Sequence, residues 1–271
     1  GELDIIALEK TFRTIIQRHE ILRTNFIEDD SGQLLQTIHP RANWKLSIKD
    51  LQNLKKWEQH EQSKQLIDDM VNTPFDLSND LLFRASIVLL KKQKTLLLIN
   101  VHHIISDGWS MGILLNEVDR IYREFIQSKK SGNTENIEIP ELPVQYADYA
   151  YWQRKMHTQG KMNTQFDYWK KQLKDVATLE LPTDKKRPAI QTFNGDHHIF
   201  QLSSVQTARI NELCQRHHIS PFMFFMGVLN VMLYRYTNQN DICVGTPVAG
   251  RNHQETESMI GLFVNTLAIR N

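Results

Sequence analysis

The chain has 271 residues, of which 41% are hydrophobic, 9% aromatic and 23% charged, as in a soluble globular protein with one large or two smaller domains. Lys and Arg number 32 against 31 Asp and Glu, and a formal net charge of +1 supplies no basic field to hold a nucleic-acid backbone. Apolar runs such as residues 96–101 are far shorter than the ~20 residues that a membrane-spanning helix needs. We therefore expect neither a nucleic-acid nor a membrane partner.

Two cysteines, Cys214 and Cys243, cannot form a disulfide framework and have neither a CxxC nor a Cys/His spacing. This usage fits a reducing cytosol, so we predict a cytoplasmic protein without a structural zinc. The chain begins with Gly1 and not Met, no signal segment opens it, and a helical stripe follows almost at once. These features predict an internal fragment of a longer domain.

Hydrophobic periodicity defines the expected elements in chain order. In the first part, the pattern predicts a helix from Ile5 to Leu22, a hairpin of strands 24–28 and 33–38, a polar helix over 51–71, and a second hairpin of strands 83–90 and 95–104 joined by 91–94. In the second part, it predicts a helix from Met111, a surface loop over 127–143, helices 144–156 and 163–173, a strand 197–202, a helix 204–217, a helix with Ser220 as N-cap and Pro221 first, and a strand 241–248.

Strands that come as hairpins between helices predict an α/β fold of the α+β kind. The stretch 181–190 is charged and bounded by prolines, which is typical of a linker between compact parts. We therefore predict a first lobe over residues 1–180, a linker over 181–190 and a second lobe over 191–271.

The side chains best suited to catalysis or binding are concentrated in one stretch, His102-His103-Ile104-Ile105-Ser106-Asp107-Gly108, where a buried strand ends and a helix begins. Open sheets place ligand sites at such points. Adjacent strand residues point to opposite faces, so we predict that one histidine is catalytic and the other structural. Two other interpretations stay open. Both histidines can be hydrogen-bonded core residues with Asp107-Gly108 as a plain turn, or they can hold a metal, which their opposed faces disfavour.

Residues 108–112 also satisfy G-x-S-x-G between a strand and a helix, as the nucleophile elbow of a hydrolase does. Candidate partners for a Ser, Asp, His order follow downstream, namely Asp148, Asp241, His217 and His253. No Gly-rich oxyanion segment precedes Ser110, and the strands form hairpins instead of βαβ units. We therefore expect Ser110 to be a helix-start residue whose loss costs about 1 kcal/mol as a lost N-cap.

The motif at residues 102–108 is HHxxxDG without departure, and the sequence resembles a condensation domain of nonribosomal peptide synthetases, in the acyltransferase superfamily that carries this motif. The resemblance covers nearly the whole chain, although family motifs expected before residue 1 and after residue 271 are missing. The other matching patterns, in order, are RHExLRTxF at 18–26, PFDL at 74–77, YxDYAxW at 146–152, LPTD at 181–184, GTPVAGR at 245–251 and IGxFVNT at 260–266.

The resemblance implies two lobes built like chloramphenicol acetyltransferase, the second of them incomplete. It also implies amide-bond formation, in which the amine of an acceptor aminoacyl thioester attacks a donor aminoacyl or peptidyl thioester. Both substrates are then held on the 4′-phosphopantetheine arms of carrier proteins, and an adenylation domain neighbours the chain in the same assembly line. No cofactor is expected to bind the chain directly, and the fragment alone is expected to be inactive.

Site roles follow residue by residue from the same resemblance. The second motif histidine is His103, which acts as general base or as positioning group. Gly108 leaves room and a backbone N–H beside the thioester. His102 and Asp107 support the site, and Asp107 pairs with Arg23, for which a solvated charge at a helix end is the alternative. The sequence 104–106 suggests the subtype that joins two L-configured residues.

Two further functions remain open besides condensation. One is a carrier-docking module without activity, which the presence of both His103 and Asp107 argues against. The other is an O-acyltransferase or serine hydrolase that uses Ser110.

Overall fold

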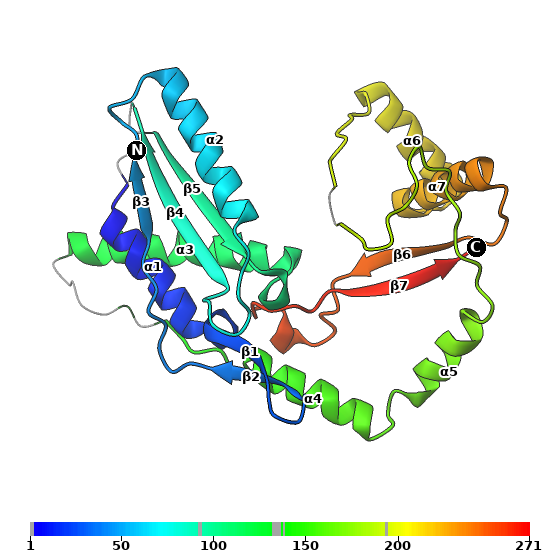
Figure 1. Ribbon diagram of the computed structural model, residues 1–271, viewed down its shortest axis with the longest axis horizontal. Helices are drawn as coiled ribbons and strands as arrows, with labels where there is room; N and C mark the ends of the chain where they lie inside the picture. The colour runs from blue at the N-terminus through cyan, green and yellow to red at the C-terminus, as the bar shows by residue number, and fades with distance from the viewer. Residues whose placement is uncertain (1–2, 92–93, 132–136, 138, 193–194) are drawn as a thin grey trace. The chain divides into compact units, whose positions relative to one another are not determined.

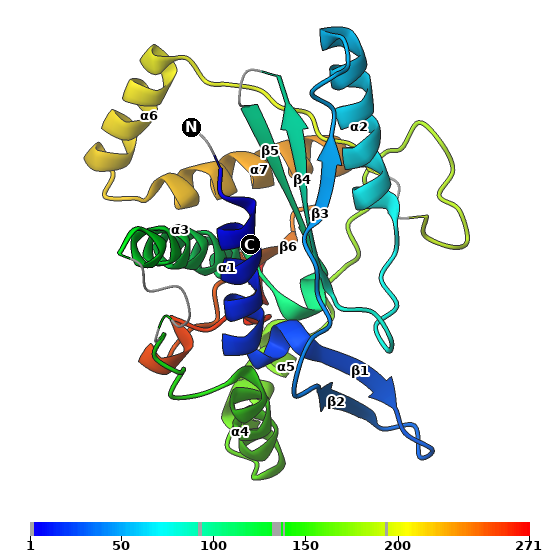
Figure 2. The same cartoon turned by 90° about the vertical axis from the view of Figure 1, so that its left-hand side faces the viewer.

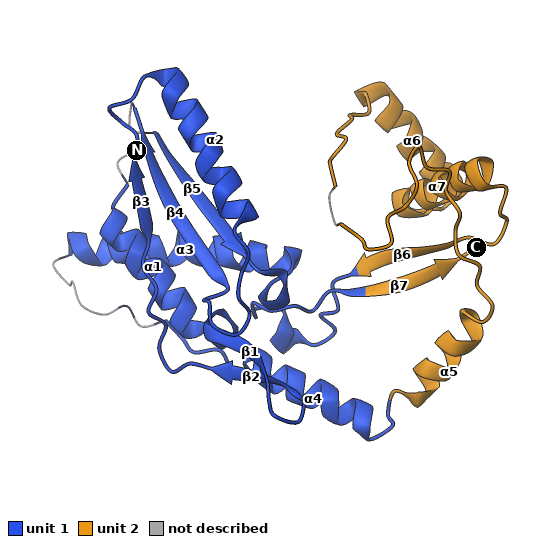
Figure 3. Ribbon diagram, viewed as in Figure 1, with its two compact units in different colours: residues 1–161, 248–265 blue, residues 162–247, 266–271 orange. Residues whose placement is uncertain are grey.

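The computed structural model describes residues 3–91, 94–131, 137, 139–192 and 195–271. The chain divides into two compact units (Figure 3), unit 1 with Gly1–Lys161 and Val248–Asn265, and unit 2 with Met162–Pro247 and Thr266–Asn271. The predicted linker 181–190 is exposed coil inside unit 2. The predicted lobes, residues 1–180 and 191–271, have different boundaries from these two units, and the division into lobes stays a prediction.

Unit 1 opens with helix α1 (Ile5–Arg18), capped by Asp4, whose side chain accepts a hydrogen bond from the Ala7 N–H at 3.0 Å. The predicted helix is confirmed, but it ends at Arg18 because His19 adopts extended backbone geometry. A short 3₁₀ helix, η1 (Glu20–Arg23), then leads into the antiparallel hairpin of β1 (Thr24–Glu28) and β2 (Leu34–Ile38). The first hairpin is therefore confirmed.

The central sheet of unit 1 has the strand order β3-β4-β5. Strands β4 (Phe83–Leu90) and β5 (Lys94–Val101) are antiparallel, as the second predicted hairpin requires, and residues 92–93 of its turn lie outside the described residues. Strand β3 (Ser47–Asp50) runs parallel to β4 and was not predicted, since its four residues are all exposed and carry no alternation. Helix α2 (Lys56–Asn72) confirms the predicted polar helix, with a later start.

Helices cover both faces of this sheet, with α2 beside β5 on one side and α1 and α3 (Gly108–Lys130) on the other (Figures 1 and 2). The apolar stripe of α1 meets the odd-numbered side chains of β4 and the apolar stripe of α3 in one core. Its fully buried members include Phe12, Ile15, Phe83, Ile87 and Ile121. Burial of each such side chain is worth about 1.5–3 kcal/mol, so this core holds α1, α3 and the sheet together.

The remaining elements of unit 1 are η2 (His103–Ile105), α4 (Tyr146–Thr158) and η3 (Gln254–Thr256). The predicted loop 127–143 is in part helix, since α3 continues to Lys130, and residues 132–136 and 138 lie outside the described residues.

Unit 2 consists of α5 (Asn163–Gln172), α6 (Ser204–Arg216), α7 (Pro221–Thr237) and the paired strands β6 (Cys243–Val248) and β7 (Asn265–Arg270), whose ends extend into unit 1. The capping of α7 is confirmed, because Ser220 Oγ accepts from the Met223 N–H at 3.2 Å and Pro221 stands first. The predicted strand 197–202 is wrong. These exposed residues pair with no described strand, and without ladder hydrogen bonds a strand does not form.

Both cysteines are free thiols. Within the part of the chain that the structure describes, no helix combines the length and the apolar character needed to cross a bilayer.

Candidate active site

The HHxxxDG motif begins where β5 ends at Val101 and forms a single 3₁₀ turn before α3. His102 caps this turn, with its Nδ1 accepting a hydrogen bond from the Ile104 N–H at 3.0 Å, and its own backbone N–H donates to Leu82 O at 2.9 Å. Neither histidine lies on the strand, so the expectation that a strand points them to opposite faces is wrong. The 3₁₀ turn separates them instead, leaving His102 half-buried and His103 exposed.

His102 is held by packing as well as by capping. Its ring meets the Phe75 ring edge-on with centroids 5.8 Å apart, and the Arg84 guanidinium lies 3.8 Å from the centroid of the same Phe75 ring. His103 contrasts with this, because among the described residues nothing hydrogen-bonds or pairs with its imidazole. The His103 ring is therefore available to a molecule from outside the chain.

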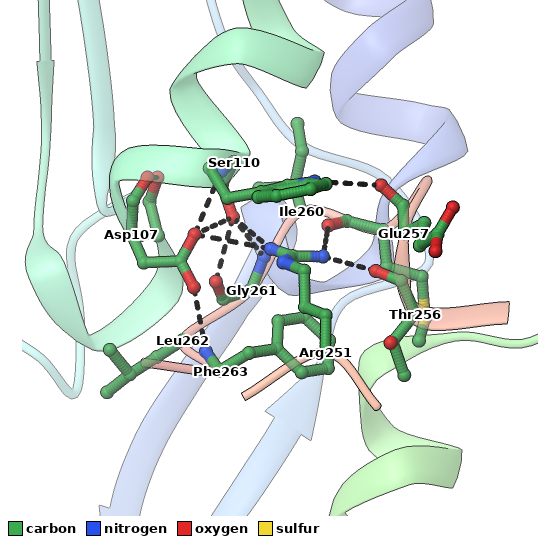
Figure 4. Close-up of polar contacts among 12 residues, drawn as sticks. Asp107, Ser110, Arg251, Thr256, Glu257, Ile260, Gly261, Leu262 and Phe263 are labelled. Atoms are coloured by element: carbon green, nitrogen blue, oxygen red, sulfur yellow. Dashed lines mark hydrogen bonds and ion pairs between the residues drawn. The ribbon is translucent and has the colours of Figure 1, made fainter. Parts of the chain in front are cut away.

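Asp107 is the N-cap of α3 and is 5% exposed. Its Oδ1 accepts hydrogen bonds from the Ser110 N–H at 2.8 Å and the Ser110 hydroxyl at 2.7 Å, and its Oδ2 accepts from the Phe263 N–H at 3.0 Å (Figure 4). Burial by itself would raise the pKa of Asp107, but these bonds and the charge of Arg251 outweigh it and hold that pKa below its ordinary value. Asp107 is therefore a charged anchor and not a proton donor at neutral pH.

Arg251 is the cation that pairs with Asp107, at 3.2 Å between Nη2 and Oδ1. Its side chain is 1% exposed, lies 4.1 Å from the centroid of the Phe263 ring, and donates through Nη1 to the carbonyls of Thr256 and Met259. A guanidinium buried to this degree needs a carboxylate and several acceptors to offset its lost hydration. Asp107 and these carbonyls supply them.

The predicted pairing of Asp107 with Arg23 is wrong. Arg23 is buried, but its guanidinium donates to the carbonyls of His39 and Gln17 and lies 3.4 Å from Glu20. These partners hold Arg23 at the base of the β1–β2 hairpin, whereas residues 251–263 pass the first turn of α3. Arg251 ends the GTPVAGR pattern, and that arginine was the available sequence signal for the missing partner.

Ser110 is fully buried at the third position of α3. Its hydroxyl lies within hydrogen-bonding distance of Asp107 Oδ1 at 2.7 Å, the Gly261 carbonyl at 2.8 Å and Arg251 Nη2 at 2.8 Å. Ser110 lies in the first turn of α3, as expected of a helix-start residue, but the N-cap is Asp107, so the expected capping role of Ser110 is wrong. A hydroxyl without exposed surface and without a described imidazole among its partners is a structural bridge, which argues against the hydrolase interpretation.

The four residues considered as triad partners of Ser110 have other contacts. Asp148 accepts from the Gln145 N–H at 2.9 Å at the start of α4, and the His253 ring packs on Trp152 with centroids 4.9 Å apart. Asp241 pairs with Arg270 at 2.7 Å, and His217 ends α6. None of the four is a hydrogen-bond partner of Ser110 among the described residues.

Residues 251–263, which we call the docked segment, belong to unit 1 and are held against its helices α3 and α4 at several points. Trp109 Nε1 donates to Glu257 O at 3.1 Å, and the Tyr146 hydroxyl donates to Leu262 O at 2.9 Å. Gly261 is required by close approach, because a Cβ there would lie 2.2 Å from Cδ2 of Tyr146. The network around Asp107 is therefore part of a continuous attachment of the docked segment to α3 and α4.

A second buried cluster joins the docked segment to the middle of α3. His19 is 1% exposed, its Nε2 lies 2.9 Å from Glu117 Oε2, and its Nδ1 accepts from the Ile260 N–H at 3.4 Å. Arg18 Nε donates to Glu117 Oε1 at 3.0 Å. Burial raises the pKa of Glu117, but His19 and Arg18 together lower it below its ordinary value. Because Nδ1 accepts, Nε2 carries the proton that His19 donates to Glu117.

Comparisons with known proteins identify the family. The family model described as "Condensation domain" matches residues 1–271. The chain belongs to the condensation domain family. It is 44% identical over 271 residues to a linear gramicidin synthase of Brevibacillus parabrevis, and the match spans 100% of this chain but 5% of that protein.

Two solved structures have the same fold as this chain. The X-domain from teicoplanin biosynthesis matches with a TM-score of 0.86 and 27% identity, over 100% of this chain and 58% of that one. The epimerization domain from the third module of tyrocidine synthetase B matches with a TM-score of 0.83 and 20% identity, over 99% of this chain and 60% of that one. The predicted α+β condensation-domain fold is confirmed. Domains with different names share it, so the reaction must be argued from the site.

Gly108 begins α3 directly after the buried carboxylate. Its φ is not in the left-handed region, and a Cβ built on it would meet nothing within 4 Å. The interpretation of Asp107-Gly108 as a turn that needs positive φ is therefore wrong. The fold of this condensation domain therefore imposes no requirement for glycine at position 108.

A metal role for the site has no support in its geometry. Among the residues that the structure describes, no three His, Cys, Asp or Glu side chains gather in a group that could hold an ion.

Proposed function

We propose that this condensation domain forms an amide bond between a donor aminoacyl or peptidyl thioester and the amine of an acceptor aminoacyl thioester. The substrates are carried on the 4′-phosphopantetheine arms of two carrier proteins, and an adenylation domain of the same cytoplasmic assembly line is a further partner. Relatives named as gramicidin and surfactin synthases support this proposal. The observation that carries it is His103, which is exposed and has no partner among the described residues. It lies on a turn that the buried Asp107–Arg251 ion pair holds, close to Gly108, where a Cβ would meet nothing within 4 Å.

In the proposed reaction the acceptor nitrogen attacks the donor carbonyl carbon, a C–N bond forms, and the C–S bond breaks to release the donor thiol. An α-amino group has a pKa of about 8 and is mostly protonated at pH 7, so the attacking species is the neutral amine left after the ammonium has given one proton to solvent. The second proton, which the nitrogen loses as the C–N bond forms, passes to His103, and His103 passes it to the departing thiolate. His103 also orients the amine, and orientation alone can lower a barrier by roughly 7–11 kcal/mol when the acyl donor is already activated.

The oxyanion that forms at the donor carbonyl needs a donor close to His103. The first turn of α3 presents backbone N–H groups at the positive end of the helix dipole, and Asp107 uses the one on Ser110. We assign the Gly108 N–H to the oxyanion, with the absent side chain leaving space for the thioester. Asp107, Arg251 and His102 position this turn and touch no substrate.

Substitution of Gly108 tests this assignment with a matched control. Gly108→Ala removes no contact, so stability should stay equal or rise by up to about 1 kcal/mol, while condensation should fall at least about tenfold. Gly112→Ala is the control, since Gly112 lies on the same helix and its Cβ would also meet nothing within 4 Å. The assay is single-turnover amide formation by the whole synthetase with loaded donor and acceptor carriers.

The two outcomes of this assay separate the function from the role of Gly108. Equal rates for the Gly108 and Gly112 variants contradict the role of Gly108. Absence of amide product from the unaltered synthetase, with both carriers loaded, contradicts condensation itself.

A further inference from the structure

A pocket of about 490 Å³ lies between α2 and the end of the β4–β5 hairpin that contains Leu90 and Lys94, where α2 lies next to β5 (Figure 1). Its α2 wall includes Lys56, His60 and Lys64, which follow each other at four-residue spacing and so share one face of the helix. The opposite wall includes Lys91 and Lys94 from the ends of the two strands. This Lys-rich pocket is one of the concave surfaces of unit 1 that the proposed function does not use.

The charge of the pocket has one sign. Lys56, Lys64, Lys91 and Lys94 line it, and no described acidic residue does. None of these lysines forms an ion pair with a described residue, although the chain as a whole balances its charges to +1. Four unpaired ammonium groups around one cavity repel each other, and a bound anion would relieve that repulsion.

The floor of the pocket is apolar. Ile67 of α2, Leu90 of β4 and Leu96 of β5 line it, and Ile67 is 38% exposed. Small-molecule sites are commonly concavities of about 300–1,000 Å³ with apolar walls and a few polar groups that fix orientation. The size and the floor therefore fit a compact ligand with an apolar body better than they fit an ion alone.

Ser63 supplies an independent indication of a polar ligand. Ser63 is one of the α2 residues that line the pocket. Its hydroxyl oxygen is buried and has no hydrogen-bond partner among the described residues. A buried hydroxyl without a partner costs free energy, and such groups in native proteins call for an explanation. A ligand oxygen that displaces the side chains covering this hydroxyl would satisfy it.

We propose that the Lys-rich pocket binds a small organic phosphate, with the apolar body on Ile67, Leu90 and Leu96 and the phosphate held by the lysines. Strand β5 runs from Lys94 in the pocket to Val101, immediately before His102. Seven steps of strand cover about 23 Å, so this site is separate from the proposed active site. The proposal therefore does not depend on the condensation reaction.

Isothermal titration of the 271-residue chain with 1-naphthyl phosphate tests the proposal. The expected result is one site with a dissociation constant below about 1 mM, weakened at higher ionic strength. The double variant Lys64→Glu/Lys94→Glu should bind at least about tenfold more weakly. The matched control Lys170→Glu/Lys171→Glu makes the same charge change at exposed residues of α5 and should bind as the unaltered chain does.

Three further arms identify the ligand chemistry. Inorganic phosphate and 1-naphthol should each bind at least about tenfold more weakly than naphthyl phosphate. Inorganic phosphate lacks the apolar body, and 1-naphthol lacks the phosphate that the lysines hold. Ser63→Ala should weaken binding without lowering the thermal unfolding temperature, since its hydroxyl has no partner to lose among the described residues. The proposal would be overturned if the two double variants bound naphthyl phosphate equally, or if naphthyl phosphate gave no heat. It would also be overturned if only poly-glutamate bound, which would indicate a protein-docking surface instead.

Discussion

Replacement of Asp107 by Asn isolates the charge at the centre of the buried network. Asn is as good an N-cap as Asp, so the first turn of α3 keeps its cap. Arg251, however, would be left as a buried cation with a 1% exposed side chain and no carboxylate. Breaking a buried pair in this way costs about 3–5 kcal/mol. Asp107→Asn should therefore lower the free energy of unfolding of unit 1 by about that amount.

The reverse substitution, Arg251→Met, should cost less. Asp107 would keep three hydrogen bonds, from the Ser110 N–H, the Ser110 hydroxyl and the Phe263 N–H. The loss should be about 1–3 kcal/mol, mainly from carbonyls of the docked segment that lose their donor. The double variant Asp107→Asn/Arg251→Met should lose less than the sum of the two, because the second change removes the stranded charge.

Urea unfolding of the three variants measures these free energies, and peptide-resolved hydrogen exchange assigns them to residues 251–263. Exchange is needed because two compact units need not unfold in one transition. Additive losses, or a larger loss for Arg251→Met than for Asp107→Asn, would refute the reasoning that an unpaired guanidinium is the dominant penalty.

Two further predictions concern the two buried polar clusters around α3. The pKa values of Asp107 and Glu117 are lowered in the folded chain, so both carboxylates stabilise it above their ordinary pKa range near 4 and this contribution is lost as the pH falls through the lower, folded values. Urea midpoints should therefore drop steeply below about pH 4, and less steeply for Asp107→Asn; an equal slope for both contradicts this. Ser110→Ala should cost about 1–3 kcal/mol, more than a lost cap, and a fluorophosphonate probe should leave Ser110 unlabelled in the unaltered chain. Stoichiometric labelling would restore the hydrolase interpretation.

Long periodic elements of this fold could be predicted from the sequence. The stripe of α1 and the Ser220-Pro221 start of α7 each contain their own evidence within one segment, since spacing and capping act locally. Strand β3 could not be found, because four exposed residues carry no alternation and exist as a strand only through pairing with β4. The false strand at 197–202 shows the converse, an apolar pattern without a partner among the described strands.

The sequence predicts which residues make up the candidate site, but it does not predict which of them form hydrogen bonds and ion pairs with one another. His102, His103, Asp107 and Gly108 stand in one short motif, so the sequence alone placed them together. The partner of Asp107 lies 144 positions away, and Arg23 and Arg251 each stand in a family pattern, so the sequence alone does not choose between them. That choice depends on the path of the docked segment past α3, which tertiary packing decides.

The most direct test of the account compares His103→Ala with His102→Ala in a single-turnover condensation assay, using the whole synthetase with loaded donor and acceptor carriers. His103 is exposed and unpartnered among the described residues, so its variant should unfold at the same urea concentration as the unaltered protein and form no amide above the uncatalysed rate. His102 caps and packs the turn, so its variant should lose stability and retain measurable condensation. Amide formation by the His103 variant at the unaltered rate would contradict the central claim.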